Sequence, residues 1–156
     1  MNVIGLHSAV WGQLQARRDR LPHALLVVGQ RGIGKFALAR AFAASLLCEN
    51  VGGSGEACGT CLACGWLAQD SHPDLRLLQP DALAVGAVAD PDEGEEAGRK
   101  KPSQQITIDQ LRALDAFLHV GTHRHGARVV LLHPAEAMNR STANALLKSL
   151  EEPIAS

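Results

Sequence analysis

The stretch HALLVVGQRGIGKFALARAFAASLL, residues 23–47, decides the fold class of this 156-residue chain. It begins with a continuous apolar run that ends at Gly29, which predicts a strand buried on both faces of a parallel sheet. From Phe36 onward, apolar residues recur at helical spacing and predict a helix. A glycine-rich turn joins the two, and an apolar strand, a glycine-rich loop and a helix in this order are the context that a phosphate-binding loop requires.

The glycine-rich turn contains the candidate phosphate-binding residues Gly29, Gly32, Gly34 and Lys35. In a working loop, backbone N–H groups wrap the phosphates, the lysine reaches the outer phosphates, and a final Ser or Thr holds Mg²⁺. Here Phe36 occupies the Ser or Thr position, and a phenyl ring cannot bind magnesium. Two interpretations stay open: a weak or vestigial nucleotide site, and a tight structural turn between strand and helix.

A second apolar run, RVVLL at residues 128–132, predicts another buried strand. In a phosphate-loop NTPase, acidic residues at the end of this strand support Mg²⁺ and polarise the attacking water. His133 and Pro134 stand in those places, and the nearest carboxylate, Glu136, lies beyond the expected strand tip. Because phosphoryl transfer depends on positioning and on the metal, we expect no ATP hydrolysis and no catalytic residue.

Four cysteines lie between the predicted helix and the second strand. Cys58, Cys61 and Cys64 are spaced C-x2-C-x2-C, and Cys48 lies ten positions before the first of them. Four thiolates are the ligands of a closed tetrahedral zinc site, and so short a polar stretch needs a metal to become ordered. We therefore expect a structural Zn²⁺ module over residues 48–64. An iron–sulfur cluster fits less well, since a ferredoxin run places its last cysteine before a proline. The other alternative is that Cys48 is a core thiol ending its helix.

The remaining segments alternate between helical and irregular patterns. Residues 82–105 contain Ala, Gly and Pro followed by an acidic and then a basic run, which predicts a flexible surface loop. Helices that alternate with strands predict an α/β fold with a parallel sheet and flanking helices. The further predicted helices are SAVWGQLQARR with Ser8 as N-cap, ITIDQLRALDAFL with a capping box at Thr107 and Gln110, and NRSTANALLKSLEEP with Asn139 or Ser141 as N-cap and a stop at Pro153.

The composition restricts the class of protein. With 46% hydrophobic residues, the chain is long enough for one packed core. A net charge of −1 and 3% aromatic residues argue against a stand-alone zinc-dependent DNA-binding module, which would need a basic groove and stacking rings. No segment approaches the roughly 18 apolar residues that span a bilayer, and the first residues lack a signal-peptide pattern. We expect a cytoplasmic protein with no membrane partner.

Three stretches, LPHALLVVGQRGIGK, CGTCLACGWLAQDSHPDL and NALLKSLEEP, together resemble the AAA+ clamp-loader subunits of bacterial DNA polymerase III, in particular those of the delta-prime type. The resemblance covers nearly the whole chain. It implies one AAA+ nucleotide-binding-like domain over residues 1–156, truncated before the lid and collar domains. It also implies a stator-like subunit of the DNA-directed DNA polymerase holoenzyme, which helps to load the sliding clamp onto primed DNA during replication. The implied partners are the motor and delta subunits and, through the complex, the sliding clamp and primed DNA.

Subunits of the delta-prime type have a degenerate nucleotide site, and the residues Phe36, His133 and Pro134 fit that description. Lys35 is kept, so ATP binding stays an open alternative. The competing interpretation is an active ATPase, a motor-type loader subunit that uses Lys35 with Glu136. The arginine that such subunits donate to a neighbouring site would lie beyond residue 156, so we expect no arginine of this chain to serve as that finger.

Overall fold

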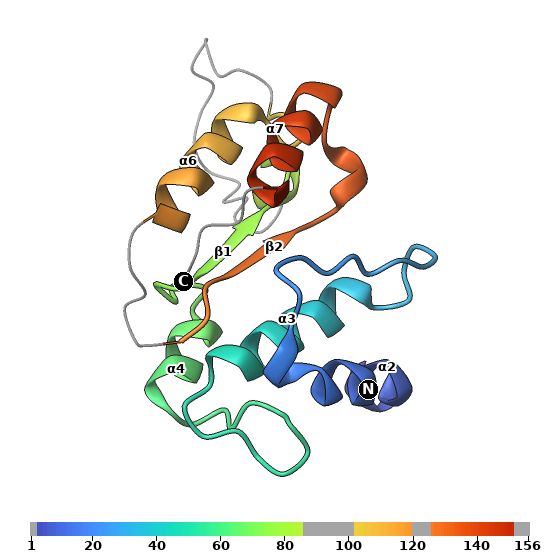
Figure 1. Cartoon of the computed structure of the whole chain (residues 1–156), viewed down its shortest axis with the longest axis vertical. Helices are drawn as coiled ribbons and strands as arrows, with labels where there is room; N and C mark the ends of the chain where they lie inside the picture. The colour runs from blue at the N-terminus through green and yellow to red at the C-terminus, as the bar shows by residue number, and fades with distance from the viewer. Residues whose placement is uncertain (1–2, 86–101, 120–125, 152–156) are drawn as a thin grey trace, which may run out of the picture. The chain divides into compact units, whose positions relative to one another are not determined.

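A computed structural model describes residues 3–85, 102–119 and 126–151 of the chain. The described residues group into two compact units, the first within Met1–Arg76 and Gly121–Leu131 and the second within Leu77–Val120 and Leu132–Ser156. Figure 1 shows the elements in chain order. None of the described helices is both long and apolar enough to cross a membrane.

The first unit is mainly helical. Its core forms where Trp11 of the second helix packs against Leu38 and Phe42 of the helix that follows the glycine-rich turn. The Trp11 and Phe42 rings meet edge to face, with centroids 6.1 Å apart. The helices of this unit are α1 (Val3–Leu6), α2 (Ser8–Ala16), the 3-10 helix η1 (Arg18–Arg20), α3 (Lys35–Leu47) and α4 (Leu62–Ala68).

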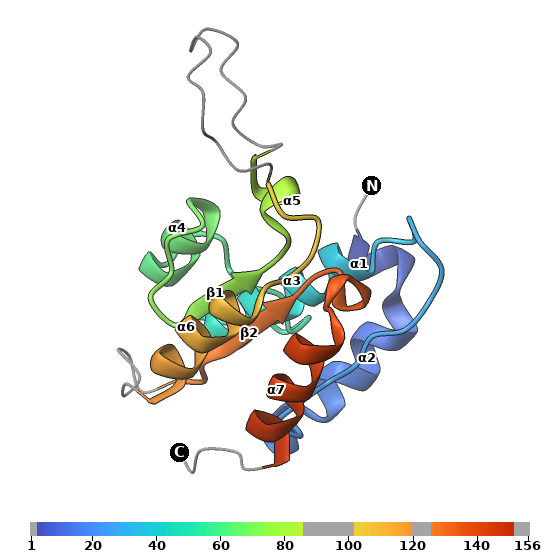
Figure 2. The same ribbon diagram turned by 90° about the horizontal axis from the view of Figure 1, so that it is seen from above.

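In the second unit, helices α6 and α7 pack against each other (Figure 2). Its buried residues include Leu78, Ile106, Leu111 and Leu114. Thr142 is also fully buried, and its hydroxyl donates to the carbonyl oxygen of Ile106 at 3.2 Å, so this polar side chain is satisfied inside the core. The helices are α5 (Asp81–Val85), α6 (Ile108–His119), the 3-10 helix η2 (Ala135–Ala137) and α7 (Arg140–Glu151).

Two strands, β1 (Leu75–Leu78) and β2 (Val129–Leu132), pair in a small parallel sheet. The Val129 N–H donates to the Asp74 carbonyl, and the His133 N–H donates to the Leu78 carbonyl. Both strands therefore run in the same direction. Strand β2 confirms that RVVLL forms a strand, although its residues are half-buried rather than buried as predicted. Strand β1 was not predicted, because a four-residue strand with an exposed Arg76 in it gives almost no periodic signal.

The strand predicted over residues 23–29 is not a strand in the structure. Residues 24–28 carry no strand assignment, and no backbone hydrogen bond joins them to another described residue. The side chains of Leu26 and Val28 are 81% and 80% exposed. A strand buried on both faces requires neighbouring strands and covering helices, and the described residues form a sheet of only two strands. The prediction of a buried strand here was therefore wrong.

The predicted helices are present, and most of their predicted caps are too. The capping box is confirmed: the Thr107 N–H donates to Gln110 Oε1 at 2.9 Å, and the Gln110 N–H donates to Thr107 Oγ1 at 3.4 Å. At the start of α7, Asn139 Oδ1 accepts the Thr142 N–H at 2.8 Å. Ser8 does not cap α2: it is already the first residue of that helix, because α1 leads directly into it.

Little of the predicted flexible loop at residues 82–105 can be compared with the structure. Residues 82–85 belong to α5, and residues 102–105 precede α6. The Ala82 N–H donates to the Ser103 carbonyl at 3.0 Å, so the two described ends of this segment lie together. Residues 86–101 lie outside the described residues, and so does Pro153.

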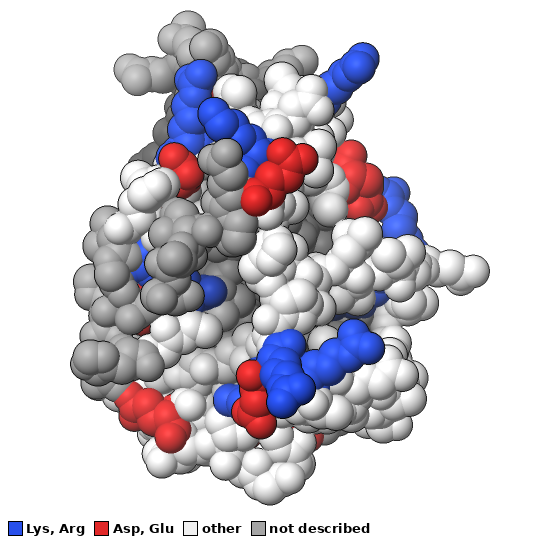
Figure 3. Space-filling view, in the orientation of Figure 1, with Lys and Arg blue, Asp and Glu red and all other residues white. Residues whose placement is uncertain are grey.

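Charged side chains of both signs are interspersed among uncharged ones on the face that Figure 3 shows. The described residues on this face form no continuous field of one sign. This distribution agrees with the net charge of −1.

Asn139→Ala tests the cap of α7. The substitution removes the acceptor for the Thr142 N–H and should lower the free energy of unfolding by about 1 kcal/mol. Urea unfolding followed by helical circular dichroism would measure it. The matched control is Asn144→Ala, in the exposed interior of the same helix, which should leave stability unchanged or raise it because alanine is the better helix former. Equal effects of the two substitutions would show that Asn139 does not act as a cap.

Candidate metal centre and phosphate loop

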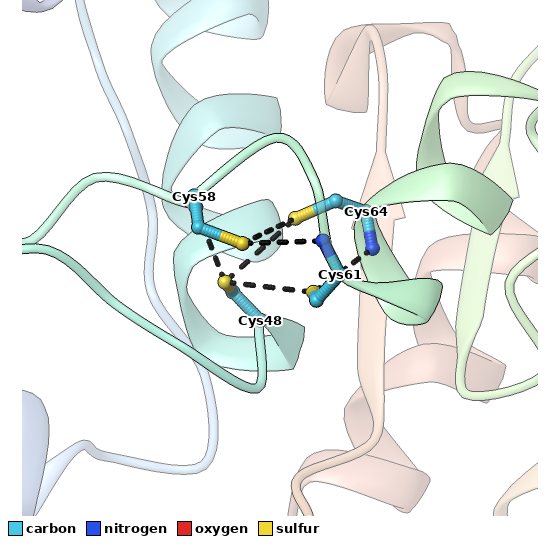
Figure 4. Close-up of side chains that lie close together, drawn as sticks. All are labelled: Cys48, Cys58, Cys61 and Cys64. Atoms are coloured by element: carbon cyan, nitrogen blue, oxygen red, sulfur yellow. Dashed lines mark hydrogen bonds between the residues drawn. The ribbon is translucent and has the colours of Figure 1, made fainter.

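The four predicted ligands come together in the first unit. Cys48 follows the last residue of α3, Cys58 and Cys61 lie in the turn before α4, and Cys64 lies inside α4. Figure 4 shows all four sulfurs pointing toward one another. Every pair of sulfurs lies within 4.8 Å, and together they form a cluster that could hold a metal ion. Hereafter these residues are the four-cysteine site.

The distances between the sulfurs fit a tetrahedral metal site. Three of the separations are 3.7 to 3.9 Å. Sulfurs placed 2.3 Å from a central ion at tetrahedral angles would lie about 3.8 Å apart. A disulfide would require about 2.05 Å, and all four cysteines are free thiols. The donor set and its spacing therefore fit a four-coordinate metal that prefers sulfur.

Backbone N–H groups surround the sulfurs and donate hydrogen bonds to them. Cys48 Sγ accepts the N–H groups of Asn50 and Cys58, at 3.4 and 3.2 Å. Cys61 is the N-cap of α4, and its sulfur accepts the Cys64 N–H at 3.4 Å. Such donors neutralise part of the negative charge that four thiolates concentrate in one place, and they orient each sulfur before a metal binds.

Two of the thiols have strongly different acidities. The backbone N–H of Thr60, followed by its hydroxyl and the Cys61 N–H, lowers the pKa of Cys58 to about 6. Burial, with hydrogen bonds from neighbouring thiols, raises the pKa of Cys64 to about 12. Cys58 is thus an anion at neutral pH, whereas Cys64 keeps its proton unless a cation compensates the charge. A cation at the centre of the cluster would supply that compensation.

The turn that leads from α4 to β1 contains a buried histidine. His72 is 3% exposed and contacts Trp66 edge to face, with ring centroids 5.7 Å apart. Its Nδ1 accepts the Asp74 N–H at 3.1 Å, and its Nε2 has no hydrogen-bond partner among the described residues. Burial holds the pKa of His72 below its usual value, although the Asp74 carboxylate acts in the opposite direction. The predictions from the sequence did not include this residue.

The four predicted phosphate-binding residues lie in a turn that is closed on itself. The Lys35 ammonium donates to the carbonyl oxygens of Gly29 and Gln30, at 2.7 and 2.6 Å. Gly34 is the N-cap of α3 with φ +86°, and a Cβ there would lie 3.2 Å from Val3. Glycine is therefore needed at this position both for its backbone conformation and for the approach of α1. A phosphate bound to Lys35 would compete with the carbonyls of the loop itself.

No described residue at the predicted magnesium positions offers an oxygen ligand from its side chain. Phe36 is the second residue of α3 and is half-buried. The backbone N–H of His133 continues the ladder at the end of β2, and Pro134 precedes η2. Glu136 is exposed in η2, beyond the strand, where the sequence predicted it. The phosphate loop belongs to the first unit and these last three residues to the second.

Comparisons with known proteins identify the family of the chain. The family model for "DNA polymerase III, delta subunit" matches residues 8–156. The chain is 47% identical over 146 residues to DNA polymerase III subunit delta′ of Pseudomonas aeruginosa, covering 94% of the chain and 38% of that protein. It is 35% identical over 137 residues to the delta′ subunit of Bacillus subtilis, covering 87% and 34%, and 33% identical over 151 residues to that of Yersinia pestis, covering 97% and 36%. The chain thus spans little more than a third of the length of these relatives.

His72→Asn tests the effect of the buried imidazole on stability. An unfolded histidine takes up its proton near pH 6.5, whereas buried His72 stays neutral to a lower pH. The stability that depends on the neutral ring is therefore complete above about pH 6.5 and is lost as pH falls through the folded-state pKa. The asparagine oxygen can accept the Asp74 N–H and does not titrate. Between about pH 7.5 and 5, the parent should lose more free energy of unfolding than the variant.

Urea unfolding at both pH values, with a chelator present, measures this difference. The control is His23→Asn, which changes an exposed histidine ahead of the glycine-rich turn and should follow the parent. If the parent and His72→Asn lose the same free energy of unfolding on acidification, protonation of His72 does not contribute.

Proposed function

The chain belongs to the family of DNA polymerase III delta-prime subunits, and on this premise we propose that it acts as a non-catalytic, stator-like subunit of the bacterial clamp loader. In this role it helps to place the sliding clamp on primed DNA during replication. Its partners are the motor and delta subunits and, through the assembled complex, the clamp and the DNA. The compartment is the cytoplasm, where replication proceeds. The fold is that of an AAA+ domain whose nucleotide site has lost its metal ligands.

One observation carries the non-catalytic assignment: Phe36 stands at the start of α3, where a hydroxyl would have to hold Mg²⁺. The positions after β2 reinforce it, because His133 and Pro134 supply no carboxylate. Without a metal to bridge the outer phosphates, the developing charge of phosphoryl transfer is not neutralised. Gly29, Gly32, Gly34 and Lys35 therefore form a weak or vestigial phosphate loop in this proposal, and an active motor-type ATPase is disfavoured.

We further propose that the four-cysteine site holds one structural Zn²⁺. Four cysteine ligands in tetrahedral arrangement are typical of structural zinc, and they leave no open position for a water molecule or a substrate. The support is the donor set together with sulfur separations of 3.7 to 3.9 Å. The ion would join the end of α3 to the start of α4. When bound, zinc supplies only charge compensation and cross-linking.

Lys35→Ala tests the non-catalytic role in the assembled clamp loader. We expect the variant subunit to leave the ATP hydrolysis rate of the complex unchanged, because hydrolysis occurs in the motor subunits. In an active site, removal of a group that stabilises the transition state would lower the rate by on the order of 100-fold. Lys148→Ala, an exposed lysine on α7, is the control for loss of a positive charge.

Phe36→Thr extends this test, since it restores one possible magnesium ligand while His133 and Pro134 stay in place. The variant should still release no phosphate when assayed by itself. ATP hydrolysis by the parent chain alone that Lys35→Ala abolishes would instead identify a motor-type subunit.

Cys61→Ser tests the zinc proposal. Serine is a good N-cap, so it can keep the start of α4 in place while the sulfur ligand is lost. Metal analysis of the purified parent should give about one zinc per chain, and the variant should give clearly less. The control is Ser54→Ala, which changes a residue of the same loop that is not a proposed ligand, and this variant should retain the metal. A parent that contains no zinc and melts at one temperature with or without added zinc would contradict the proposal.

A further inference from the structure

One face of the N-terminal helices is directed at the loop between the first two cysteines. Trp11 and Gln15 lie four positions apart on one face of α2, and Arg18 begins η1 just after that helix. Hereafter these three residues are the α2 clamp. All three donate hydrogen bonds to residues within, or just before, the segment from Cys48 to Cys58.

Two members of the α2 clamp hold the tip of this loop. Trp11 Nε1 donates to the Ser54 carbonyl at 3.0 Å, and Gln15 Nε2 donates to the Gly55 carbonyl at 3.1 Å. The loop is closed locally by the Gly55 N–H, which donates to the Gly52 carbonyl at 2.9 Å. Because Trp11 is buried in the core of the unit, its hydrogen bond attaches the tip of the loop to that packed core.

The third member holds the base of the loop. Arg18 donates to the carbonyl and the hydroxyl of Ser45, at 2.6 and 3.3 Å. Ser45 is fully buried on α3, three positions before Cys48. The α2 clamp thus contacts both the helix end that presents Cys48 and the loop that leads to Cys58.

Gly55 allows the close contact with the α2 clamp. Its φ is +77°, and a Cβ at this position would lie 2.4 Å from Gln15 Cδ and 2.6 Å from Gln15 Oε1. A side chain at this position would therefore require the Gln15 side chain to move away from its contact with the loop. Gly53, two positions earlier, has no atom within 4 Å of the place where a Cβ would be. The close approach is specific to Gly55.

We infer that the α2 clamp positions the metal ligands, and that with Gly55 it sets the affinity of the four-cysteine site. Binding requires the sulfurs of Cys48 and Cys58 to meet across a ten-residue separation, and ordering a free loop of this length costs conformational entropy. Contacts that order the loop before the metal arrives remove part of that cost from the binding step. The inference rests on the proposed metal site, and it assigns a positioning role to residues that are far from the cysteines in sequence.

Cobalt(II) titration of the metal-free, reduced chain tests this role, because four thiolates give cobalt a visible absorption band that zinc lacks. Competition with a chelator of known affinity then gives the dissociation constant. Gln15→Ala should weaken binding by about 2- to 10-fold, as expected for loss of a neutral hydrogen bond. Gly55→Ala should weaken it by about tenfold or more, since collision and backbone strain add. Gly53→Ala should bind as the parent does.

The double variant Gln15→Ala with Gly55→Ala separates the contact from the backbone effect. If the collision with Gln15 matters, the Gly55→Ala substitution costs less affinity in the Gln15→Ala background than in the parent. Circular dichroism of the metal-free forms checks that the variants keep the helical content of the parent.

The possible outcomes distinguish the metal site itself from the positioning role of the α2 clamp. A parent that binds no cobalt rejects the proposed metal site itself. A parent that binds cobalt, with Gln15→Ala and Gly55→Ala both binding it as tightly as the parent does, rejects the α2 clamp while keeping the metal site. Equal costs of Gly55→Ala in both backgrounds would show that its effect comes from the backbone conformation at Gly55, and would overturn the role assigned to the contact between Gln15 and Gly55.

Discussion

The proximity of four thiol sulfurs is the constraint on which the first unit depends. Groups that would repel one another as thiolates lie 3.7 to 3.9 Å apart, so their common charge must be compensated. Backbone N–H groups supply part of that compensation, and a metal ion would supply the rest. Cys48 ends α3, Cys61 caps α4, and the loop between the first two cysteines meets α2. The positions of these helices and the positions of the four sulfurs therefore depend on each other.

The sequence predicted those features that depend on residues close together in the chain. The four cysteines lie within a span of seventeen residues, and the capping box at Thr107 and Gln110 lies within four. The spacing along the chain was therefore enough to predict that these residues come together. Features that depend on distant partners were predicted less well. The apolar run at residues 23–29 predicted burial, yet burial requires neighbouring strands that no short pattern can supply.

The contacts of the α2 clamp were not predictable from the sequence for the same reason. Gln15 and Gly55 are forty positions apart, and neither belongs to a recognisable motif. The available signal was Gly55 itself within VGGSGE, but glycines in a polar loop normally indicate only a turn. Only the structure shows why a glycine stands at this position, because a Cβ there would collide with the side chain of Gln15. Similarly, His72 is identified by its burial rather than by its spacing.

We propose that the chain has a phosphate loop without the groups that ATP hydrolysis requires, and that a metal centre at the four-cysteine site stabilises the ends of α3 and α4. The most direct test of that centre is X-ray absorption at the zinc edge of the purified protein. We predict four sulfur neighbours at about 2.3 Å and no open coordination position. Fewer sulfurs together with nitrogen or oxygen ligands at about 2.0 to 2.2 Å would contradict the account, because the site would then be open or built from residues other than the four cysteines.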